Sequence, residues 1–138
     1  MKGKVEVDMP VLGIGGVFVK SSDPDLSRRW YQEVLGLELN SYGGFDFSHA
    51  KAADAFGDGA RTILARFEDG SDYFAPSQQP FMINLIVEDM DTLLARIEAS
   101  GTQLVGDPQS FDYGRFAWLV DPDGVKIELW EPPAKTAA

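Results

Sequence analysis

The chain has 138 residues, 44% of them hydrophobic, which is enough for one domain with a packed core. The formal net charge of -10 repels nucleic-acid phosphates and anionic lipids, so we expect neither of them as a partner. There is no cysteine, which excludes disulfides, thiolate metal sites and a cysteine nucleophile.

The chain opens on a charged stretch, residues 1–8, where a secretory signal would need its apolar core. No apolar run in the sequence approaches the ~20 residues that cross a bilayer. We therefore expect a cytoplasmic protein with no membrane partner.

A strand over 14–20 and a helix after Asp23 are the first elements that the sequence predicts. Residues 14–20 are rich in β-branched and aromatic types. The acidic cap Asp23 precedes Pro24, a residue favoured in the first helical turn, and apolar residues then recur at helical spacing as far as Leu35. Gly36 supplies the left-handed conformation that ends such a helix.

The middle of the chain is expected to contribute more β-structure. Residues 37–42 and 45–48 alternate in polarity on either side of a Gly-Gly pair, which predicts a hairpin. A looser stretch, 50–59, precedes a further predicted strand over 61–67. The Gly, Ser, Asp, Pro and Gln residues of 69–80 are typical of a long connection.

After this connection the pattern repeats. Residues 81–87 form an apolar strand, Asp89 caps a second helix, and Gly101 closes it. Three short β segments are then expected, at 103–105, 115–120 and 125–130.

The two halves share the order of strand, acidic cap, helix and strands. A right-handed crossover in each half places both helices on one face of the sheet and leaves the other face for a ligand. We therefore predict an α+β fold in a single domain over 10–134, with one module at about 13–68 and a second at about 80–132.

Three segments, in this order, resemble the vicinal oxygen chelate superfamily of glyoxalases, bleomycin-resistance proteins and extradiol dioxygenases. They are the strand into Asp23 with the helical residues 30–37, the strand into Asp89, and the stretch 121–129; the resemblance spans 14–132. It implies two βαβββ modules that form a curved, partly open mixed sheet around a small organic molecule. It also implies a homodimer in which modules pair across chains.

Metal sites in this superfamily use a His or similar ligand seven residues before each acidic cap, together with a Glu in the final strand. The corresponding positions here hold Gly16, Met82 and Glu128. Gly16 has no ligating side chain, and the soft thioether of Met82 does not suit Zn²⁺, Ni²⁺ or Mn²⁺ in an oxygen-rich site. A single carboxylate does not hold a catalytic metal, so we expect no metal cofactor.

Alternation along 125–130 selects the candidate site residues. Three apolar residues of this strand point toward the helices, so Lys126, Glu128 and Trp130 point into the cavity. An acid beside an aromatic ring suits a binding site, and Glu128 is the candidate catalytic residue. The alternatives are that Glu128 is a solvated strand residue or forms an ion pair with a neighbouring Arg or Lys.

Other predicted ligand contacts come from three further segments. Met82 and Asn84 face the cavity by the same alternation, and an amide can both donate and accept hydrogen bonds. Phe18 is expected in the wall of the cavity. Arg115, beside a glycine at the mouth of a hairpin, could hold a ligand carboxylate. The alternatives are a backbone contact for Asn84, core packing for Phe18, and a surface ion pair for Arg115, with Glu128 as one candidate partner.

These observations favour a metal-independent protein that binds a small aromatic or amphipathic compound and sequesters it. The rival hypothesis is a metal-dependent lyase, isomerase or dioxygenase in which His49, Asp46 or Asn84 joins Glu128. A third hypothesis makes Glu128 a metal-free acid or base. His49, the only histidine, lies at the edge of the predicted hairpin, where a loop position is the simpler interpretation.

Overall fold

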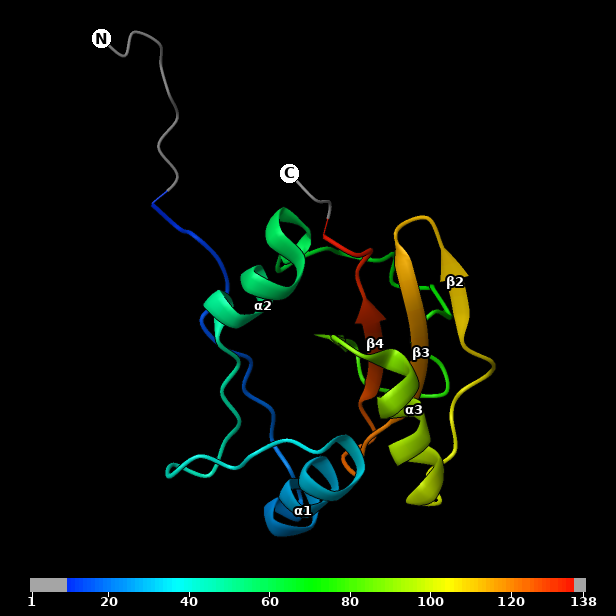
Figure 1. The fold of residues 1–138 in the computed structure, drawn as a ribbon. Coiled ribbons are helices and arrows are strands. Elements are labelled where there is room, and N and C mark those ends of the chain that lie inside the picture. Colours follow the sequence, from blue (N-terminus) through cyan, green and yellow to red (C-terminus); the bar gives the residue numbers. More distant parts are fainter. Residues whose placement is uncertain (1–9, 136–138) are drawn as a thin grey trace, which may run out of the picture.

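The computed structural model describes residues 10–135, so the charged stretch 1–8 lies outside the described part. The elements in chain order are α1 (Pro24–Leu35), α2 (His49–Phe56), the 3-10 helix η1 (Gly57–Gly59), β1 (Met82–Ile86), α3 (Met90–Ala99), β2 (Gln109–Phe111), β3 (Gly114–Val120) and β4 (Lys126–Glu131) (Figure 1). The fold class is α+β, as the sequence predicts. Within residues 10–135, no helix is long and apolar enough to cross a membrane.

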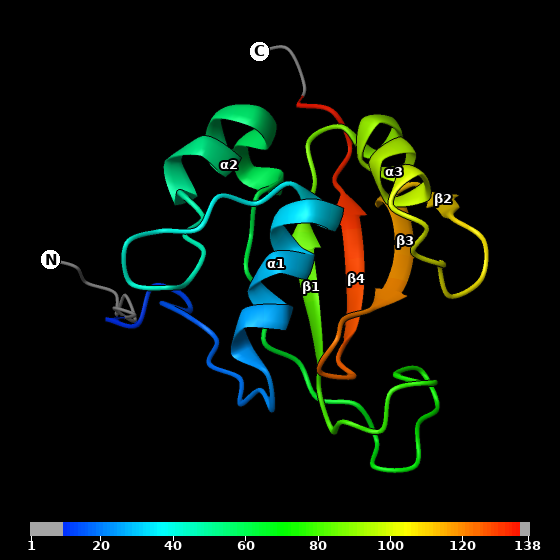
Figure 2. The ribbon, with the colours of Figure 1, turned by 90° about the horizontal axis from the view of Figure 1, so that it is seen from below.

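The sheet is open, mixed and four-stranded, in the order β1-β4-β3-β2 (Figure 2). β1 runs parallel to β4, and the other two pairs are antiparallel. In this register Asn84 of β1 and Trp118 of β3 both lie beside Glu128 of β4. Glu128 on β4 therefore lies between side chains of both neighbouring strands, β1 and β3.

Both predicted helices begin and end where the sequence indicates. The Asp23 carboxylate accepts a hydrogen bond from the backbone N–H of Leu26, and Gly36 ends α1 with a φ of 73°. In α3, Asp89 accepts from the N–H of Thr92 at 3.1 Å. The hydrogen bond from the Thr92 hydroxyl is the main cause that lowers the pKa of Asp89.

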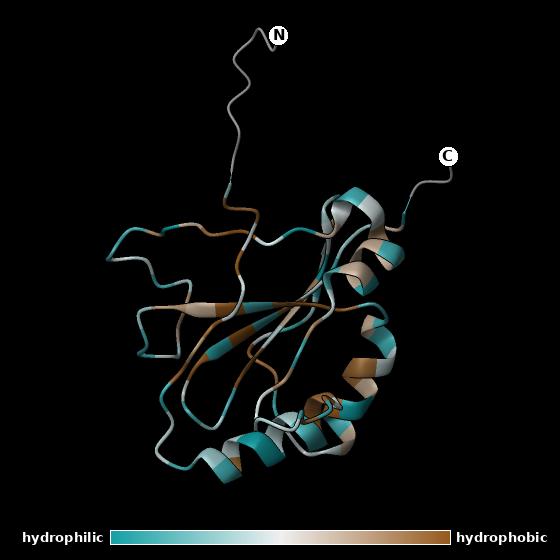
Figure 3. Cartoon of the chain, turned by 90° about the vertical axis from the view of Figure 1, so that its left-hand side faces the viewer, coloured by the Kyte–Doolittle hydropathy of each residue, from teal (hydrophilic) through white to brown (hydrophobic). Residues whose placement is uncertain are grey.

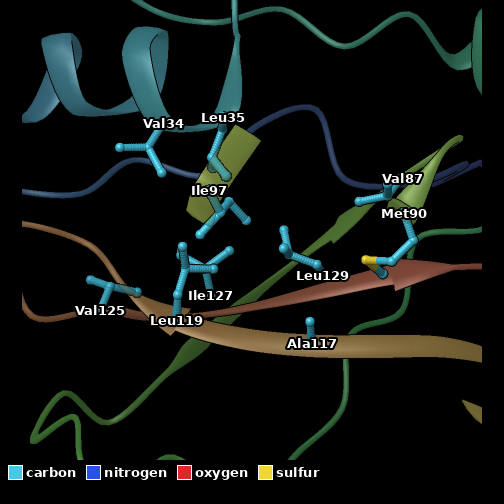
Figure 4. Packing of buried hydrophobic residues seen from close by; sticks show 10 residues of the cluster. All are labelled: Val34, Leu35, Val87, Met90, Ile97, Ala117, Leu119, Val125, Ile127 and Leu129. Carbon is cyan, nitrogen blue, oxygen red and sulfur yellow. The ribbon is translucent and has the colours of Figure 1, made fainter. Parts of the chain in front are cut away.

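The core lies between one face of the sheet and the helices α1 and α3. Figure 4 shows Val34 and Leu35, at the end of α1, pointing toward Ile97 of α3 and toward the side chains of the sheet. The buried cluster comprises Val34, Leu35, Val87, Met90, Ile97, Ala117, Leu119, Val125, Ile127 and Leu129. The predicted inward face of 125–130 is therefore confirmed. The helices that contribute to this cluster, α1 and α3, pack on this same face of the sheet.

The strands predicted in the first half are not formed in the described chain. Residues 14–20, 37–42, 45–48 and 61–67 carry no strand assignment, although a turn closes between the N–H of Asn40 and the carbonyl of Gly44 at 2.8 Å. Figure 3 shows hydrophobic stretches along the extended chain that follows the N-terminus. Strand propensity expresses a fit to neighbouring strands, and these segments have no paired strand beside them within residues 10–135.

Three elements, α2, η1 and β2, were missing from the prediction, and one predicted strand of the second half was wrong. α2 occupies most of the stretch that was expected to be loose, so His49 begins a helix instead of lying in a hairpin loop. Ser48 caps this helix by accepting from the N–H of Lys51, and alanine fills four of its eight positions. β2 was also missed, and 103–105 forms no strand although Val105 donates to the carbonyl of Trp118 at 2.7 Å.

Asp121 connects α1 to the turn between β3 and β4. Its carboxylate is buried and accepts hydrogen bonds from the Tyr31 hydroxyl and from the N–H groups of Asp123 and Val125. Burial is the main cause that raises the pKa of Tyr31, and the bond to Asp121 adds to it. This bond therefore joins α1 to the turn between β3 and β4, and the phenol keeps its proton to a higher pH than a free tyrosine does.

Substitution of Tyr31 by phenylalanine is expected to reduce the free energy of unfolding by about 2 kcal/mol, because a buried carboxylate loses one donor. Urea denaturation followed by fluorescence measures the difference. Tyr42→Phe is the matched control, since Tyr42 is 95% exposed and its substitution should change stability by less than about 0.5 kcal/mol. Equal effects of the two substitutions would contradict a stabilising role for the bond between Tyr31 and Asp121.

Candidate functional site

The sheet face opposite α1 and α3 is called here the open face. Along each strand, the residues that alternate with the core residues point to this face. Its side chains are Met82, Asn84 and Ile86 from β1, Lys126, Glu128 and Trp130 from β4, Phe116, Trp118 and Val120 from β3, and Gln109 and Phe111 from β2. Four predicted site residues therefore share one face: Met82, Asn84, Glu128 and Trp130.

Glu128 is the polar centre of the open face. It is only 8% exposed, and three neutral donors reach its carboxylate. The Asn84 amide donates to Oε1 at 2.8 Å, the Trp118 indole N–H donates to Oε2 at 2.8 Å, and the Tyr73 hydroxyl donates to Oε2. All three groups that donate hydrogen bonds to the carboxylate are uncharged, and the carboxylate is the acceptor in each bond.

Lys126 lies beside this carboxylate on the same strand and is 7% exposed. Its Nζ donates to the backbone carbonyl of Tyr73 at 2.6 Å and lies 5.0 Å from the centroid of the Tyr73 ring. The Trp118 ring is 6.0 Å away. Burial lowers the pKa of Lys126, and the negative charge of Glu128 opposes this shift. The open face thus holds a buried cation next to a buried anion.

Aromatic rings cover the rest of the open face. Trp118 and Phe116 lie nearly parallel, with centroids 6.2 Å apart, and Phe116 and Trp130 continue the row at 6.4 Å. Phe111 and Tyr113 stack at 5.1 Å and meet the Phe116 ring at steeper angles. Such a row offers flat apolar surface to a planar molecule, beside the hydrogen-bonding groups around Glu128.

Two predicted contacts do not lie on this face. Arg115 points to the helix side, where its guanidinium lies 2.9 Å from the Asp91 carboxylate and 3.7 Å from that of Glu131. The alternative of a surface ion pair is therefore confirmed for Arg115, with Asp91 and Glu131 as the partners and not Glu128. Phe18 lies in the extended chain before α1 and is 95% exposed, so it lines no wall within this chain.

The donor groups around Glu128 do not fit a divalent metal. Gly16 offers no ligand, Met82 offers a thioether, and both oxygens of Glu128 already accept hydrogen bonds. Within residues 10–135, no group of three His, Cys, Asp or Glu side chains is placed to hold a metal ion. Of His49, Asp46 and Asn84, the other predicted metal ligands, Asn84 contacts Glu128, and the contact is a hydrogen bond from its amide N–H.

Sequence reasoning missed Tyr73 and Trp118. Trp118 could have been found, because alternation along β3 sets it on the same face as Glu128. Tyr73 lies in the connection 69–80, and a contact across a sequence separation of 55 residues has no local signal.

An alkaline titration isolates the contact of Tyr73 with Glu128. Burial, followed by the hydrogen bond to Glu128, raises the pKa of Tyr73 to about 12. Because the neutral phenol is favoured in the folded state, its contribution to stability is complete below the unfolded pKa of about 10 and is lost as the pH rises through 12. The difference in absorbance near 295 nm between wild type and Tyr73→Phe is expected to show one phenol ionising near pH 12. Ionisation of that phenol near pH 10 would contradict the contact.

Comparisons with known proteins agree with this architecture. The model of the Glyoxalase-like domain family matches residues 16–130. The chain is 26% identical over 114 residues to a protein of Mycobacterium tuberculosis described as "Putative glyoxylase CFP32", covering 79% of this chain and 40% of that protein's length. The chain thus spans well under half of this curated relative.

Solved structures of related proteins share the fold. TnmS3, an antibiotic-binding protein from Streptomyces sp. CB03234, is 25% identical with a TM-score of 0.55, covering 91% of this chain and 99% of that one. A glyoxylase/bleomycin resistance protein/dioxygenase domain from Frankia sp. EAN1pec is 20% identical with a TM-score of 0.55, covering 88% and 98%. Lactoylglutathione lyase from Agrobacterium tumefaciens is 18% identical with a TM-score of 0.52, covering 89% and 96%. The chain belongs to the glyoxalase-like domain family of the vicinal oxygen chelate superfamily.

Proposed function

We propose that this protein binds a small aromatic molecule on the open face, without a catalytic metal, and sequesters it rather than converting it. The observation that carries the proposal is the row of nearly parallel rings of Trp118, Phe116 and Trp130 beside the hydrogen-bonded carboxylate of Glu128. TnmS3, at 25% identity, is an antibiotic-binding protein, which supports a small-molecule ligand.

The open face offers an apolar stacking surface and hydrogen-bonding groups, and binding of a small aromatic molecule uses both. Each stacked aromatic pair contributes about 0.5 to 1.5 kcal/mol beyond the burial of apolar area, so several rings give affinity for flat molecules. The polar groups at one end of the row fix the orientation of the ligand. Among the side chains of residues 10–135, no three His, Cys, Asp or Glu are grouped to ligate a metal ion that could act as a Lewis acid, and this favours binding over the metal-dependent alternative.

We also propose that the site is completed in a homodimer. The extended segments 10–20 and 60–67 expose large apolar side chains, and β1 is an edge strand of the sheet. The most exposed of these side chains are Val11, Leu12, Val17, Phe18, Ile63 and Leu64, each more than half exposed. A second copy of this chain fits as the occupant, because segments with strand propensity can pair with an unpaired sheet edge.

Sedimentation equilibrium at micromolar concentration tests the dimer. We expect twice the chain mass for the wild type, and the monomer mass for a variant that carries both Phe18→Asp and Ile63→Asp. The control is Tyr42→Asp, which places a charge at an equally exposed position outside the two segments. A wild-type monomer would contradict the proposed assembly.

Ligand binding is tested with proflavine, a planar aromatic cation without hydroxyl groups, by isothermal titration calorimetry on the full chain. Trp130→Ala is expected to weaken binding at least about tenfold, because an aromatic anchor is lost. Tyr42→Ala removes a comparable ring that is 95% exposed and should leave the affinity unchanged. If proflavine does not bind, or binds equally to Trp130→Ala, the open face is not the site.

A further inference from the structure

We propose that Tyr73 occupies the site as an internal ligand, and that the natural ligand is a hydroxyaryl compound whose hydroxyl group takes the place of the Tyr73 hydroxyl on Glu128. This inference rests on the proposed function and names the chemical class of its ligand. It concerns a tyrosine that comes from outside the helices and strands of the fold.

The contacts of Tyr73 are those that a free phenol would need. Its hydroxyl donates to Glu128, and the ammonium of Lys126 lies 5.0 Å from the centroid of its ring. The Phe67 ring stacks on the Tyr73 ring, with centroids 5.5 Å apart and an angle of 16° between the planes. A hydrogen bond at the hydroxyl, a cation at the ring and a parallel aromatic partner together define a hydroxyaryl site.

The Tyr73 side chain is suited to exchange with a ligand. It is 38% exposed, and the chain around it forms turns rather than a helix or strand. Its stacking partner Phe67 is 49% exposed and lies in an extended segment. When Tyr73 swings out, Glu128 loses one donor, and the hydroxyl group of a ligand restores it. The exchange therefore leaves no buried acceptor unpaired.

The charges around Glu128 define which ligands are rejected. Asn84 and Trp118 both donate to the carboxylate, so it takes part only as an acceptor. A hydroxyl group can donate to it, whereas a methyl ether cannot and a second carboxylate is repelled. The expected order of affinity is phenol first, then methyl ether, then benzoate.

The test uses p-cresol, which is the side chain of tyrosine as a free molecule, and its methyl ether 4-methylanisole. Isothermal titration calorimetry on the full-length wild type is expected to show at least about tenfold tighter binding of p-cresol. Tyr73→Phe keeps the ring but removes the competing hydroxyl, so it should raise the affinity for both probes about tenfold and leave the preference for p-cresol over 4-methylanisole as in the wild type. Tyr42→Phe is the control and should change neither.

Two results would overturn the inference: equal affinity of the wild type for the two probes, or no gain in p-cresol affinity in Tyr73→Phe. Absence of p-cresol binding in both proteins counts against it in the same way. Proflavine separates this failure from failure of the proposed function. If proflavine still binds and Trp130→Ala still weakens it, the open face remains a ligand site and only the hydroxyaryl class is wrong.

Discussion

Substitution of Gly114 by alanine is expected to reduce the free energy of unfolding by more than about 3 kcal/mol, which is a fall of about 10 °C in Tm. A Cβ at this position would lie 2.5 Å from the backbone carbonyl oxygen of Glu131 and 2.5 Å from the indole nitrogen of Trp130. The φ of 131° adds strain for any residue with a side chain. Because neither the carbonyl nor the hydrogen-bonded indole can retreat freely, β3 and β4 must separate locally. Thermal unfolding followed by circular dichroism measures the effect.

Gly124→Ala is the control for this substitution. Gly124 also has a positive φ, of 78°, but a Cβ there would meet no atom within 4 Å. Its substitution should cost about 1 to 2 kcal/mol from backbone strain alone. If the two variants lose equal stability, the close approach of Trp130 to Gly114 is not what requires glycine.

Replacement of Glu128 by leucine is expected to reduce the free energy of unfolding by about 2 to 3 kcal/mol and to abolish the preference for p-cresol over 4-methylanisole. Leucine fills much of the volume but leaves the donors of Tyr73, Asn84 and Trp118 without their acceptor. Asn84 and Tyr73 are partly exposed and can turn to water, which keeps the loss below the sum of three bonds. Urea denaturation gives the change in stability, and calorimetry gives the preference.

The control for the Glu128 substitution is Glu88→Leu, which removes an exposed carboxylate from the segment after β1. It is expected to change stability by less than about 0.5 kcal/mol and to leave probe binding as in the wild type. A stable Glu128→Leu protein that still prefers p-cresol would show that the carboxylate is not the recognition group.

The alternation of side chains along a strand explains which site residues were predicted correctly and why Arg115 was not. Applied to β1 and β4, it correctly brought Met82, Asn84, Glu128 and Trp130 to one face. The same rule applied to β3 sets Arg115 with the core residue Ala117, on the helix side. Arg115 was instead assigned from its glycine neighbour and its charge, and a chemical argument alone does not tell one face of a strand from the other.

The first half of the chain could be predicted only in part, because a helix and a strand depend on different partners. α1 carries its own hydrogen bonds, its acidic cap and its terminal glycine in sequence, so its bounds follow from local residues. The segments 14–20 and 61–67 have strand composition, but their hydrogen bonds must come from another strand. In the homodimer that we propose, that strand would come from the second copy of the chain.

Tyr73 marks the limit of what the sequence reveals about the site. The connection 69–80 has the composition of a loop, and nothing in that composition points to Glu128. The contact depends on how the turn between Phe74 and Ser77 packs against the turn between β3 and β4. There the Ser77 hydroxyl donates a hydrogen bond to the backbone carbonyl of Gly124. Long-range geometry of this kind follows from packing rather than from local pattern.

The most direct test of ligand binding on the open face is an NMR titration of the indole N–H signals with proflavine, assigned by Trp→Phe variants. The three tryptophans divide between the two sides of the sheet: Trp118 and Trp130 lie on the open face, and Trp30 lies on α1 against the core. We expect the Trp118 and Trp130 signals to shift together with one saturation curve, while the Trp30 signal stays in place. A shift of Trp30 alone, or no shift of Trp118 and Trp130 at saturation, would contradict binding on the open face.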